Sequence, residues 1–317
     1  MQSTEVPVSR AAEGTFVGVN WGSTNFRAYL IGADGAALDD YAVPAGIVTL
    51  DRTGMAATMD ELAARWPDRG PVYASGMIGS NVGWTEVPYA QAPAGCADLA
   101  TAVVSTTIGR VATHIVPGIA CRRSFDGQPD VLRGEEIELL GLAALRNVDG
   151  WVDGWVALPG THTKWARIER GRVVDFFTSM SGEIFDRLTA KGLLASIVDG
   201  EAADGPVFLQ GVAVGQARRL GLGTLLFGAR AQVVRGDLAK KDAASYIRGL
   251  LIGSEIADAL AVCPTLRDGV VPLIGNAALS RLYASALLAA GVRSEAFDSR
   301  AACLRGFRAL HEMCRRG

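Results

Sequence analysis

The chain has 317 residues, of which 49% are apolar and 20% are charged, and its formal net charge at pH 7 is −2. This composition excludes a wholly disordered chain, and the near-neutral charge gives no broad positive field of the kind that favours nucleic acid or an anionic membrane. Because single hydrophobic cores stop growing at about 250–300 residues, a chain of this length predicts two domains.

The five cysteines lie far apart and form no C-x-x-C pair, so neither a disulfide framework nor a zinc knuckle is indicated. The pattern favours a reducing cytoplasm. The first 13 residues are polar and lack the apolar stretch of a signal peptide, which predicts a flexible tail. No apolar run approaches the roughly 20 residues that span a bilayer, so we expect a soluble cytoplasmic protein.

The first predicted elements are two strands joined by a polar turn. Residues 16–19 form a short apolar run, residues 22–25 (GSTN) form the turn, and residues 26–31 form the second strand. Residues 32–35 contain two glycines and predict a hairpin turn. The chain therefore begins with antiparallel strands.

A helix and a buried strand are predicted next. Asp51 or Thr53 can cap the helix, and Pro67 ends it. Residues 72–74 predict the buried strand. Residues 75–84 (SGMIGSNVGW) predict a loop, because they contain too much glycine for a regular element.

In the middle of the chain, Arg133 and Gly134 open a helix that we expect to run to Arg146. Its acidic residues, Glu135 and Glu136, lie in the first turn and Arg146 lies in the last, which matches the helix dipole.

The segment after this helix repeats the pattern of the beginning. A strand at residues 155–159 leads into a turn at residues 160–163 (GTHT), and a hairpin follows with strands at residues 164–168 and 173–177. The turn aligns with residues 22–25, 138 positions earlier. The identity between the copies is slight, so duplication and chance are left equally open.

The remaining sequence alternates helices and strands. We expect a helix at residues 246–262, a strand at 270–274, a helix at 279–290 and a last helix around 304–314. The predicted architecture is two similar α/β domains, each beginning with an antiparallel hairpin that carries a polar Gly-[Ser/Thr] turn.

The two Gly-[Ser/Thr] turns are suited to binding phosphate. Such a turn presents backbone N–H groups and hydroxyls, and no bulky side chain blocks the approach. Two such turns facing across a cleft could hold both ends of a triphosphate, which would supply the positioning and charge stabilisation that phosphoryl transfer needs. Since hairpin turns commonly contain Gly and Thr, a purely structural turn stays equally open.

Several other chemistries are excluded or disfavoured. The sequence has no G-x-x-x-x-G-K-[ST] P-loop and no G-x-G-x-x-G after a strand. The three histidines are isolated from one another, and no H-E-x-x-H occurs, so a zinc hydrolase has little support. His114 and His311 are best explained as structural residues, whereas His162 lies inside the second turn and is left open.

Glu135 and Glu136 have two interpretations. They complement the helix dipole, and they could equally serve catalysis. A kinase that acts on an alcohol needs a carboxylate to accept the hydroxyl proton and carboxylates to hold hydrated Mg²⁺.

Beyond these inferences, the chain resembles the 2-dehydro-3-deoxygalactonokinase family from about residue 15 to its end. The segments that carry the resemblance occur in the family's order: VNWGSTNFRA, SGMIGSNVGW, LRGEEIELLG, LPGTHTKW, LLFGARA and LLIGSEIA. The resemblance implies an actin-like sugar kinase with two ribonuclease H-like α/β domains and a nucleotide and substrate cleft between them. It gives a tail of residues 1–13, an N-terminal domain of residues 14–132 and a C-terminal domain of residues 133–317, whose last helix could return to the first domain.

The implied activity is ATP-dependent phosphorylation of the C6 hydroxyl of 2-dehydro-3-deoxy-D-galactonate, in D-galactonate breakdown, with Mg²⁺. Glu135 matches the position of the general base in related sugar kinases, and Glu136 is left as an alternative. The residues that match the ATP and phosphate segments are Gly22, Ser23, Thr24, Asn25, Arg27, Gly160, Thr161, His162, Lys164, Gly275 and Asn276. The residues that match the substrate side are Gly46, Ile47, Val48, Gly76, Met77, Ser80, Asn81 and Trp84, with Arg133 or Arg230 as cations for the carboxylate.

Asn20 departs from the family pattern, which has Asp before Trp-Gly-Ser-Thr. The Asp orients Mg²⁺ through water, and its replacement by an amide typically costs on the order of a hundredfold in rate. Asn20 and Glu135 are the implied metal residues. Three interpretations stay open: a slowed kinase, a kinase whose metal is carried by Glu135 and Glu136, and a chain altered to trap substrate.

Two alternative functions are kept beside the kinase. One is a nucleotide and sugar-acid binding protein of the same fold with impaired catalysis, which Asn20 supports. The other is a kinase for a related keto-deoxy sugar acid. Small-molecule partners are expected, nucleic acid and membrane are not, and a homodimer is left open.

Overall fold

The computed structural model describes residues 14–145 and 153–316, which form two compact units. The described residues of the first unit are 14–120, 131–145 and 300–316, and those of the second are 121–130 and 153–299. The expected boundary between residues 132 and 133 therefore differs from the observed division. Both the helix that begins at Glu135 and the last helix belong to the first unit.

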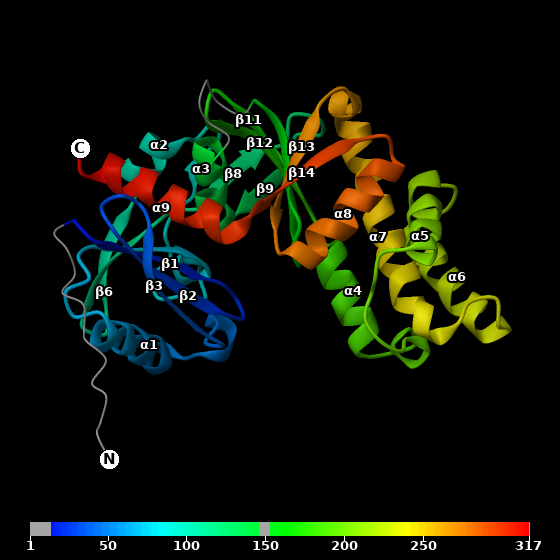
Figure 1. Ribbon diagram of the computed structural model, residues 1–317, viewed down its shortest axis with the longest axis horizontal. Coiled ribbons are helices and arrows are strands. Elements are labelled where there is room, and N and C mark those ends of the chain that lie inside the picture. Colours follow the sequence, from blue (N-terminus) through cyan, green and yellow to red (C-terminus); the bar gives the residue numbers. More distant parts are fainter. Residues whose placement is uncertain (1–13, 146–152, 317) are drawn as a thin grey trace, which may run out of the picture. The chain divides into compact units, whose positions relative to one another are not determined.

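The first unit contains a six-stranded sheet in the order β3-β2-β1-β4-β7-β6 (Figure 1). β1 is antiparallel to β2 and parallel to β4, and β4 is parallel to β7. The strands are β1 (Phe16–Trp21), β2 (Phe26–Ile31), β3 (Ala37–Val43), β4 (Val72–Gly76), β6 (Val104–Ile108) and β7 (Val111–Ile115). Its helices are α1 (Arg52–Arg65), α2 (Cys96–Thr101), α3 (Glu135–Leu145) and α9 (Ser299–Cys314).

The second unit repeats this topology with the sheet order β12-β11-β10-β13-β14. Its strands are β10 (Gly154–Leu158), β11 (Thr163–Glu169), β12 (Arg172–Ser179), β13 (Val270–Gly275) and β14 (Arg293–Asp298). Its helices are α4 (Ser181–Ala190), α5 (Pro206–Ala217), α6 (Leu222–Arg235), α7 (Lys240–Val262) and α8 (Ala277–Ala289). A small third sheet contains β5 (Ala90–Gln91), β8 (Ile119–Arg122) and β9 (Pro129–Leu132), in the order β5-β8-β9.

In both large sheets an antiparallel three-stranded meander is followed by two parallel strands on the other side of its first strand, and the first sheet adds β6, which is antiparallel to β7. This order is that of the ribonuclease H-like fold, so the predicted fold class is confirmed. The sequence did not predict α4, α5 and α6, and it started α7 six residues too late.

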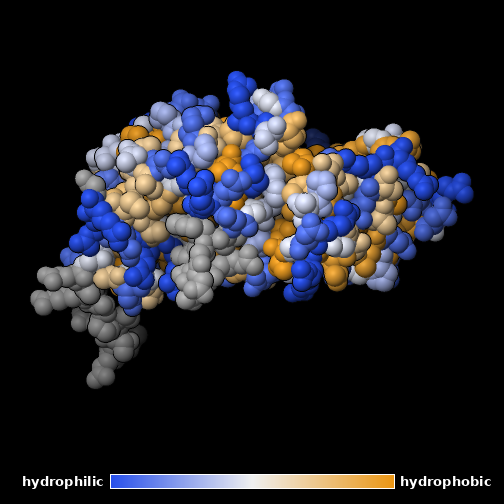
Figure 2. Space-filling view, turned by 90° about the horizontal axis from the view of Figure 1, so that it is seen from above, coloured by the Kyte–Doolittle hydropathy of each residue, from blue (hydrophilic) through white to orange (hydrophobic). Residues whose placement is uncertain are grey.

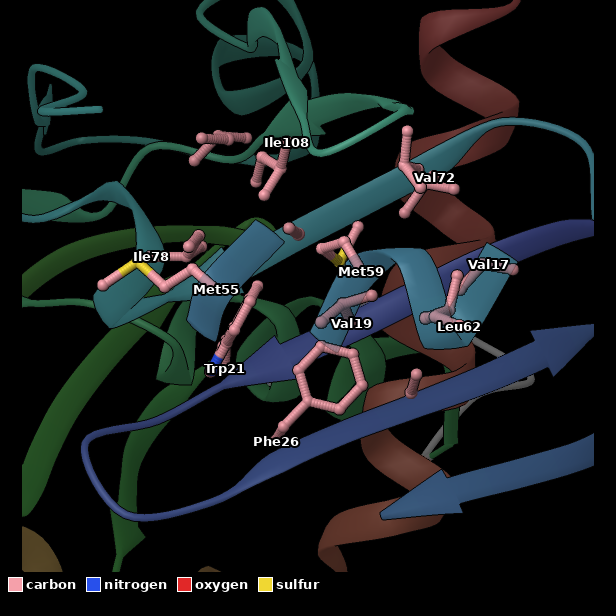
Figure 3. Packing of buried hydrophobic residues seen from close by; sticks show 14 of the residues in the cluster. Val17, Val19, Trp21, Phe26, Met55, Met59, Leu62, Val72, Ile78 and Ile108 are labelled. Atoms are coloured by element: carbon pink, nitrogen blue, oxygen red, sulfur yellow. The ribbon is translucent and has the colours of Figure 1, made fainter. Parts of the chain in front are cut away.

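The core of the first unit lies between its sheet and α1 (Figure 3). Trp21 and Phe26 meet edge to face, with ring centroids 4.8 Å apart, and both are fully buried. Met59 and Leu62 of α1 pack on the same face. Asp51, one of the two predicted caps, accepts a hydrogen bond from the N–H of Gly54 at 2.8 Å and begins α1.

α3 and α9 are in direct backbone contact, although about 160 residues separate them along the chain. A Cβ atom at Gly141 would lie 1.8 Å from the carbonyl oxygen of Ala302, and one at Gly306 would lie 1.9 Å from that of Ile137. This close crossing explains why both helices belong to the first unit. Arg146, predicted as the last residue of the first of these helices, lies outside the described residues.

The surface mixes hydrophilic and hydrophobic residues on the face that Figure 2 shows. In the second unit, exposed apolar side chains occur around α6 at Leu220, Phe227 and Val234. Within the described ranges, no helix has the length and apolar character needed to cross a membrane.

Candidate active site

The first predicted phosphate turn connects β1 to β2 and is held from behind by a second loop. The N–H of Gly22 donates to the carbonyl oxygen of Asn25 at 2.9 Å and closes the turn. The carbonyl oxygens of Gly22 and Ser23 accept from the N–H groups of Ile47 and Val48 at 3.1 and 3.2 Å. Only glycine fits at position 46, because a Cβ atom there would lie 2.1 Å from the Ser23 oxygen.

The exposed part of this turn consists of side chains that can bind an anion. Ser23, Thr24 and Asn25 are all exposed, and the Asn25 amide donates to the Thr24 hydroxyl at 3.0 Å. Arg27 is also exposed on β2. The structure thus brings the predicted turn residues together with Gly46–Val48, which were assigned to a different role.

Asn20 lies on β1, one residue before the strand ends, and is half-buried. In the sheet register it is opposite Arg27 on β2 and Ser75 on β4. Its side-chain amide donates to the sulfur of Cys303 on α9 at 3.9 Å. Sequence reasoning missed Cys303, because its contact with Asn20 joins positions 283 residues apart.

Two glycines bring the start of α3 to the ends of β1 and β4. Gly76 ends β4 with φ +93°, and a Cβ atom there would lie 2.6 Å from the carbonyl oxygen of Trp21. Gly134 precedes α3 with φ +110°, and its Cβ atom would lie 3.4 Å from the Cα atom of Gly76. A side chain at Gly76 would push β4 away from β1, and one at Gly134 would be strained by the positive φ, so the glycines set where the acidic helix start lies.

The two acidic residues at the start of α3 have different environments. Glu135 is half-buried and its carboxylate accepts from the N–H of Arg133 at 2.9 Å. Glu136 is fully buried, and one of its oxygens accepts from the N–H of Gly134 at 2.5 Å, whereas Oε1 has no hydrogen-bond partner. Burial, with a smaller contribution from the charge of Glu135, raises the pKa of Glu136 to about 8.

The predicted substrate loop begins later than the sequence suggested. Ser75 and Gly76 belong to β4, because Gly76 still pairs with Trp21 of β1. A 3₁₀ turn at Met77–Gly79 follows, and the Ser80 hydroxyl donates to the Met77 carbonyl oxygen at 2.7 Å. The segment is therefore an ordered turn.

Two further side chains of this loop were predicted to face substrate. Trp84 has one ring face covered by the guanidinium of Arg52, whose Cζ lies 3.9 Å from the ring centroid. Arg52 also donates to the Trp84 carbonyl oxygen at 2.7 Å. Asn81, in contrast, is exposed.

Arg133 lies behind the glycine-rich loop. Its Nη2 donates to the Val87 carbonyl oxygen at 2.8 Å, and its Cζ lies 4.2 Å from the centroid of the Tyr89 ring. A Cβ atom at Gly79 would lie 2.8 Å from Nη1 of Arg133. Nε and Nη1 are buried without a hydrogen-bond partner, which leaves a positive charge with unused donors directly beneath this loop.

The second predicted phosphate turn lies in the other unit and is held by the start of α4. The Thr161 carbonyl oxygen accepts from the N–H of Glu183 at 2.8 Å, and a Cβ atom at Gly182 would lie 2.3 Å from the Gly160 oxygen. The His162 ring nitrogen Nε2 lies 2.6 Å from the Glu183 carboxylate, which also meets Arg187 at 3.4 Å. The hydrogen bond with His162 lowers the pKa of Glu183.

Lys164 does not extend from this turn as a free cation. Its side chain is 6% exposed, and its ammonium donates to the Thr178 hydroxyl at 2.9 Å. Thr178 in turn donates to Asp130 at 2.7 Å. The predicted phosphate contact from Lys164 would have to compete with this pairing.

A buried polar cluster underlies the second turn and was not predicted. Thr163, the last residue of the GTHT motif, lies 2.8 Å from the Tyr283 hydroxyl, which donates to Glu255 at 2.9 Å. Glu255 also accepts from Trp165 at 2.8 Å and from Ser181. Burial raises the pKa of Glu255, which is 2% exposed.

The predicted adenosine segment forms the turn from β13 to α8. Gly275 ends the strand, and the Asn276 side chain caps α8 by accepting from the N–H of Leu279 at 2.8 Å. A pocket of about 510 Å³ opens beside this turn. It is lined by Phe185, Ala202, Ala203, Asp204, Arg248, Asn276, Ala278, Leu279, Arg281 and Leu282.

The chain has clear relatives. A family profile described as 2-keto-3-deoxy-galactonokinase matches residues 20–310. The chain is 36% identical over 291 residues to a probable 2-dehydro-3-deoxygalactonokinase of Rhizobium meliloti (strain 1021), covering 90% of this chain and 93% of that protein. It is 31% identical over 306 residues to the 2-dehydro-3-deoxygalactonokinase of Escherichia coli (strain K12), covering 93% and 97% of the two chains.

A solved structure agrees with these relatives. The crystal structure of a protein from Sinorhizobium meliloti, described as a 2-dehydro-3-deoxygalactonokinase, matches with a TM-score of 0.84 and 34% identity. The match covers 94% of this chain and 96% of that one.

Proposed function

The chain belongs to the 2-keto-3-deoxy-galactonokinase family, and from this premise we propose that it transfers the γ-phosphoryl group of ATP to the C6 hydroxyl of 2-dehydro-3-deoxy-D-galactonate. The observation that carries the proposal is the family match over residues 20–310. It is supported by the placement of the first Gly-Ser-Thr turn, the acidic start of α3 and the glycine-rich loop in one unit, at the ends of β1 and β4.

In this proposal the two turns bind the phosphates of ATP. The exposed hydroxyls of Ser23, Thr24 and Thr161 and the backbone N–H groups around Gly22 and Gly160 are donors of the kind that stabilise phosphate charge. The same turns also carry polar side chains, those of Asn25, Arg27 and His162. Gly275 and Asn276 border the pocket that we assign to the nucleoside.

We propose Glu135 as the general base. The C6 hydroxyl oxygen forms the new bond to the γ-phosphorus, the bond from that phosphorus to the bridging oxygen of ADP breaks, and the hydroxyl proton passes to the Glu135 carboxylate. Glu135 is favoured over Glu136 because it is partly exposed, whereas Glu136 is fully buried. Glu136 stays the alternative.

The family implies a divalent metal, and the residues present fit Mg²⁺. Asn20 and Glu135 offer amide and carboxylate oxygens, and Glu136, next to Glu135 in the sequence, has a buried Oε1 atom without a hydrogen-bond partner. Mg²⁺ usually keeps several waters and takes only one or two protein carboxylates beside the substrate phosphates. When bound, the ion would neutralise charge on the phosphates, and Asn20 and Glu135 would hold it.

The sugar acid is assigned to the loops after β3 and β4. Gly46, Ile47 and Val48 border the first turn, and the residues of the second loop that we assign to substrate are Gly76, Met77, Ser80, Asn81 and Trp84. The buried Arg133 guanidinium lies beneath Gly79, so its charge would strengthen anion binding by the loop amides. We therefore propose that the substrate carboxylate binds at this loop. Arg230 lies on α6 in the second unit.

Coupled measurement of ADP release tests the proposed reaction. The protein should release ADP from Mg-ATP with 2-dehydro-3-deoxy-D-galactonate and less efficiently with the gluconate-derived acid. Glu135→Gln should lower kcat by about a thousandfold while ATP affinity stays within a few fold. Glu61→Gln, an exposed carboxylate of α1, is the matched control and should keep full turnover. Near-normal turnover of Glu135→Gln would transfer the role to Glu136.

A catalytically impaired binding protein is the second candidate, because Asn20 replaces the Asp of the family pattern. The variant Asn20→Asp distinguishes the candidates. We expect it to raise kcat, on the order of a hundredfold if the missing charge limits metal binding. Equal rates for both forms would show that the amide serves as well as the carboxylate.

Two predictions on the protein's surroundings stay untested. A cytoplasmic location is predicted from the five cysteines, all of which are free in the structure. A homodimer stays open.

A further inference from the structure

The nucleoside pocket contains a cation whose role no sequence motif assigned. Arg248 is the ninth residue of α7 and lines the 510 Å³ pocket beside Asn276. It is half-buried, and its Nη1 atom is buried without a hydrogen-bond partner. Because Nη1 is closed off within the protein, a ligand in the pocket meets Arg248 through the plane of the guanidinium or through its other nitrogens.

The guanidinium of Arg248 is held flat by its neighbour. Its Cζ atom lies 4.5 Å from the centroid of the Phe185 ring, which comes from α4 and lines the same pocket. This geometry is that of a cation over an aromatic face. Phe185 therefore fixes the plane of the guanidinium.

The rest of the pocket is largely apolar. Ala278, Leu279 and Leu282 line it from the first turns of α8. Such a wall suits the flat face of a ring, and Asp204 and Arg281 of the same pocket can meet the polar parts of a nucleoside. Together with the planar guanidinium, it favours a heteroaromatic base as occupant.

We propose that Arg248 binds the base of the nucleotide through stacking by its guanidinium plane. The inference rests on the proposed function, which supplies the nucleotide, and adds the residue that determines base preference. Because a purine presents a larger face than a pyrimidine, Arg248 makes this pocket selective for purine nucleotides. ATP and GTP bind more tightly than CTP and UTP, and the preference depends on Arg248.

Nucleotide binding by titration calorimetry tests the proposal without requiring turnover. We expect Arg248→Ala to weaken ATP binding by about tenfold. CTP binding should change by no more than about twofold, so the purine preference shrinks. Arg248→Lys keeps the positive charge but lacks the planar guanidinium, so it should show most of the same loss of ATP affinity.

A probe without a base separates recognition from a general structural effect. Inorganic tripolyphosphate can use only the phosphate turns, so Arg248→Ala should bind it as the unchanged protein does. Arg235→Gln is the matched control, because Arg235 is a highly exposed arginine of α6 in the same unit and does not line the pocket. Thermal unfolding without nucleotide shows whether each variant is folded.

Two outcomes overturn the inference. One is a folded Arg248→Ala protein that binds ATP within about twofold of the unchanged protein. The other is an equal loss of ATP and tripolyphosphate binding, which would show a structural role. Failure of the kinase proposal looks different: the unchanged protein would bind ATP with the expected preference and yet release no ADP with the sugar acid.

Discussion

The two predicted phosphate turns follow the first strand of each large sheet, but they are supported by different interactions. The turn at Gly22–Asn25 is braced by backbone hydrogen bonds to Ile47 and Val48, none of which involves a titratable group. The turn at residues 160–162 is held by the start of α4, and a side-chain hydrogen bond between His162 and Glu183 is part of that support. The fold therefore fixes where a turn lies, whereas the loops that follow the hairpin decide how it is held.

The largest expected effect comes from placing a side chain at the glycine where each turn meets the backbone of the segment that supports it. Gly46→Ala places a Cβ atom 2.1 Å from the Ser23 oxygen, and Gly182→Ala places one 2.3 Å from the Gly160 oxygen. Backbone must move in both cases, and we expect each variant to lose about 2–4 kcal/mol of unfolding free energy and most of its ATP affinity. Urea unfolding and nucleotide titration measure the two effects.

Gly228→Ala is the control for this pair, because a Cβ atom there meets nothing within 4 Å and the residue is inside α6. Alanine is the better helix former, so this variant should gain about 0.5–1 kcal/mol. If Gly46→Ala were as stable as the unchanged protein, this would contradict the inference that the close backbone contact at Gly46 supports the first turn.

An intermediate effect is expected from the carboxylate beneath the second turn. In Glu255→Gln, one acceptor oxygen becomes a donor that faces Trp165 or the Tyr283 and Ser181 hydroxyls. A buried donor without a partner costs about 1–3 kcal/mol, and we expect that loss in urea unfolding. ATP affinity should fall as well, because Thr163 of the turn contacts the same Tyr283 hydroxyl. Unchanged stability would show that the cluster is not needed to hold the turn.

The smallest effect should come from removing the hydrogen bond between His162 and Glu183. His162→Ala removes a pair in which the histidine side chain is 47% exposed, so we expect the KM for ATP to rise by only about threefold, with unfolding unchanged. A loss of turnover greater than tenfold would indicate that His162 contacts the reacting phosphate.

The pH dependence of this contact follows from the carboxylate. Because His162 holds the pKa of Glu183 below its usual value of 4.5, the contribution of the pair is present above that value and is lost as the pH falls through the lower pKa. No such loss of support at low pH is expected for the first turn, because it is held by backbone hydrogen bonds.

What the sequence predicted well was local. Glycine, serine and threonine after a short apolar run indicated both turns, and a glycine before two acids indicated the start of α3, since these signals depend only on neighbouring residues. The fold class was then confirmed by the sheet topology, and the family by the relatives.

What the sequence could not predict depends on contacts between distant segments. The partner of Asn20 is Cys303, 283 residues away, and the partner of Trp165 is Glu255, 90 residues away. Glu255 lies in the quoted segment LLIGSEIA, but nothing in that segment indicates which side chain it contacts. Nothing in the sequence indicated that α5 and α7 pack against each other. Gly211 and Gly249, which weaken a helix prediction, are where the two helices touch: a Cβ atom on either would lie 2.1 Å from a carbonyl oxygen of the other helix.

Because α9 packs in the first unit, that unit cannot complete its fold until α9 has been synthesised. Gly18 of the first strand is covered by Phe307, the ring of Phe16 stacks on that of His311 at 4.2 Å, and the amide of Asn20 contacts Cys303. None of these contacts can exist until the residues of α9 have left the ribosome. β1 therefore waits for neighbours that are synthesised much later, whereas all described segments of the second unit precede residue 300.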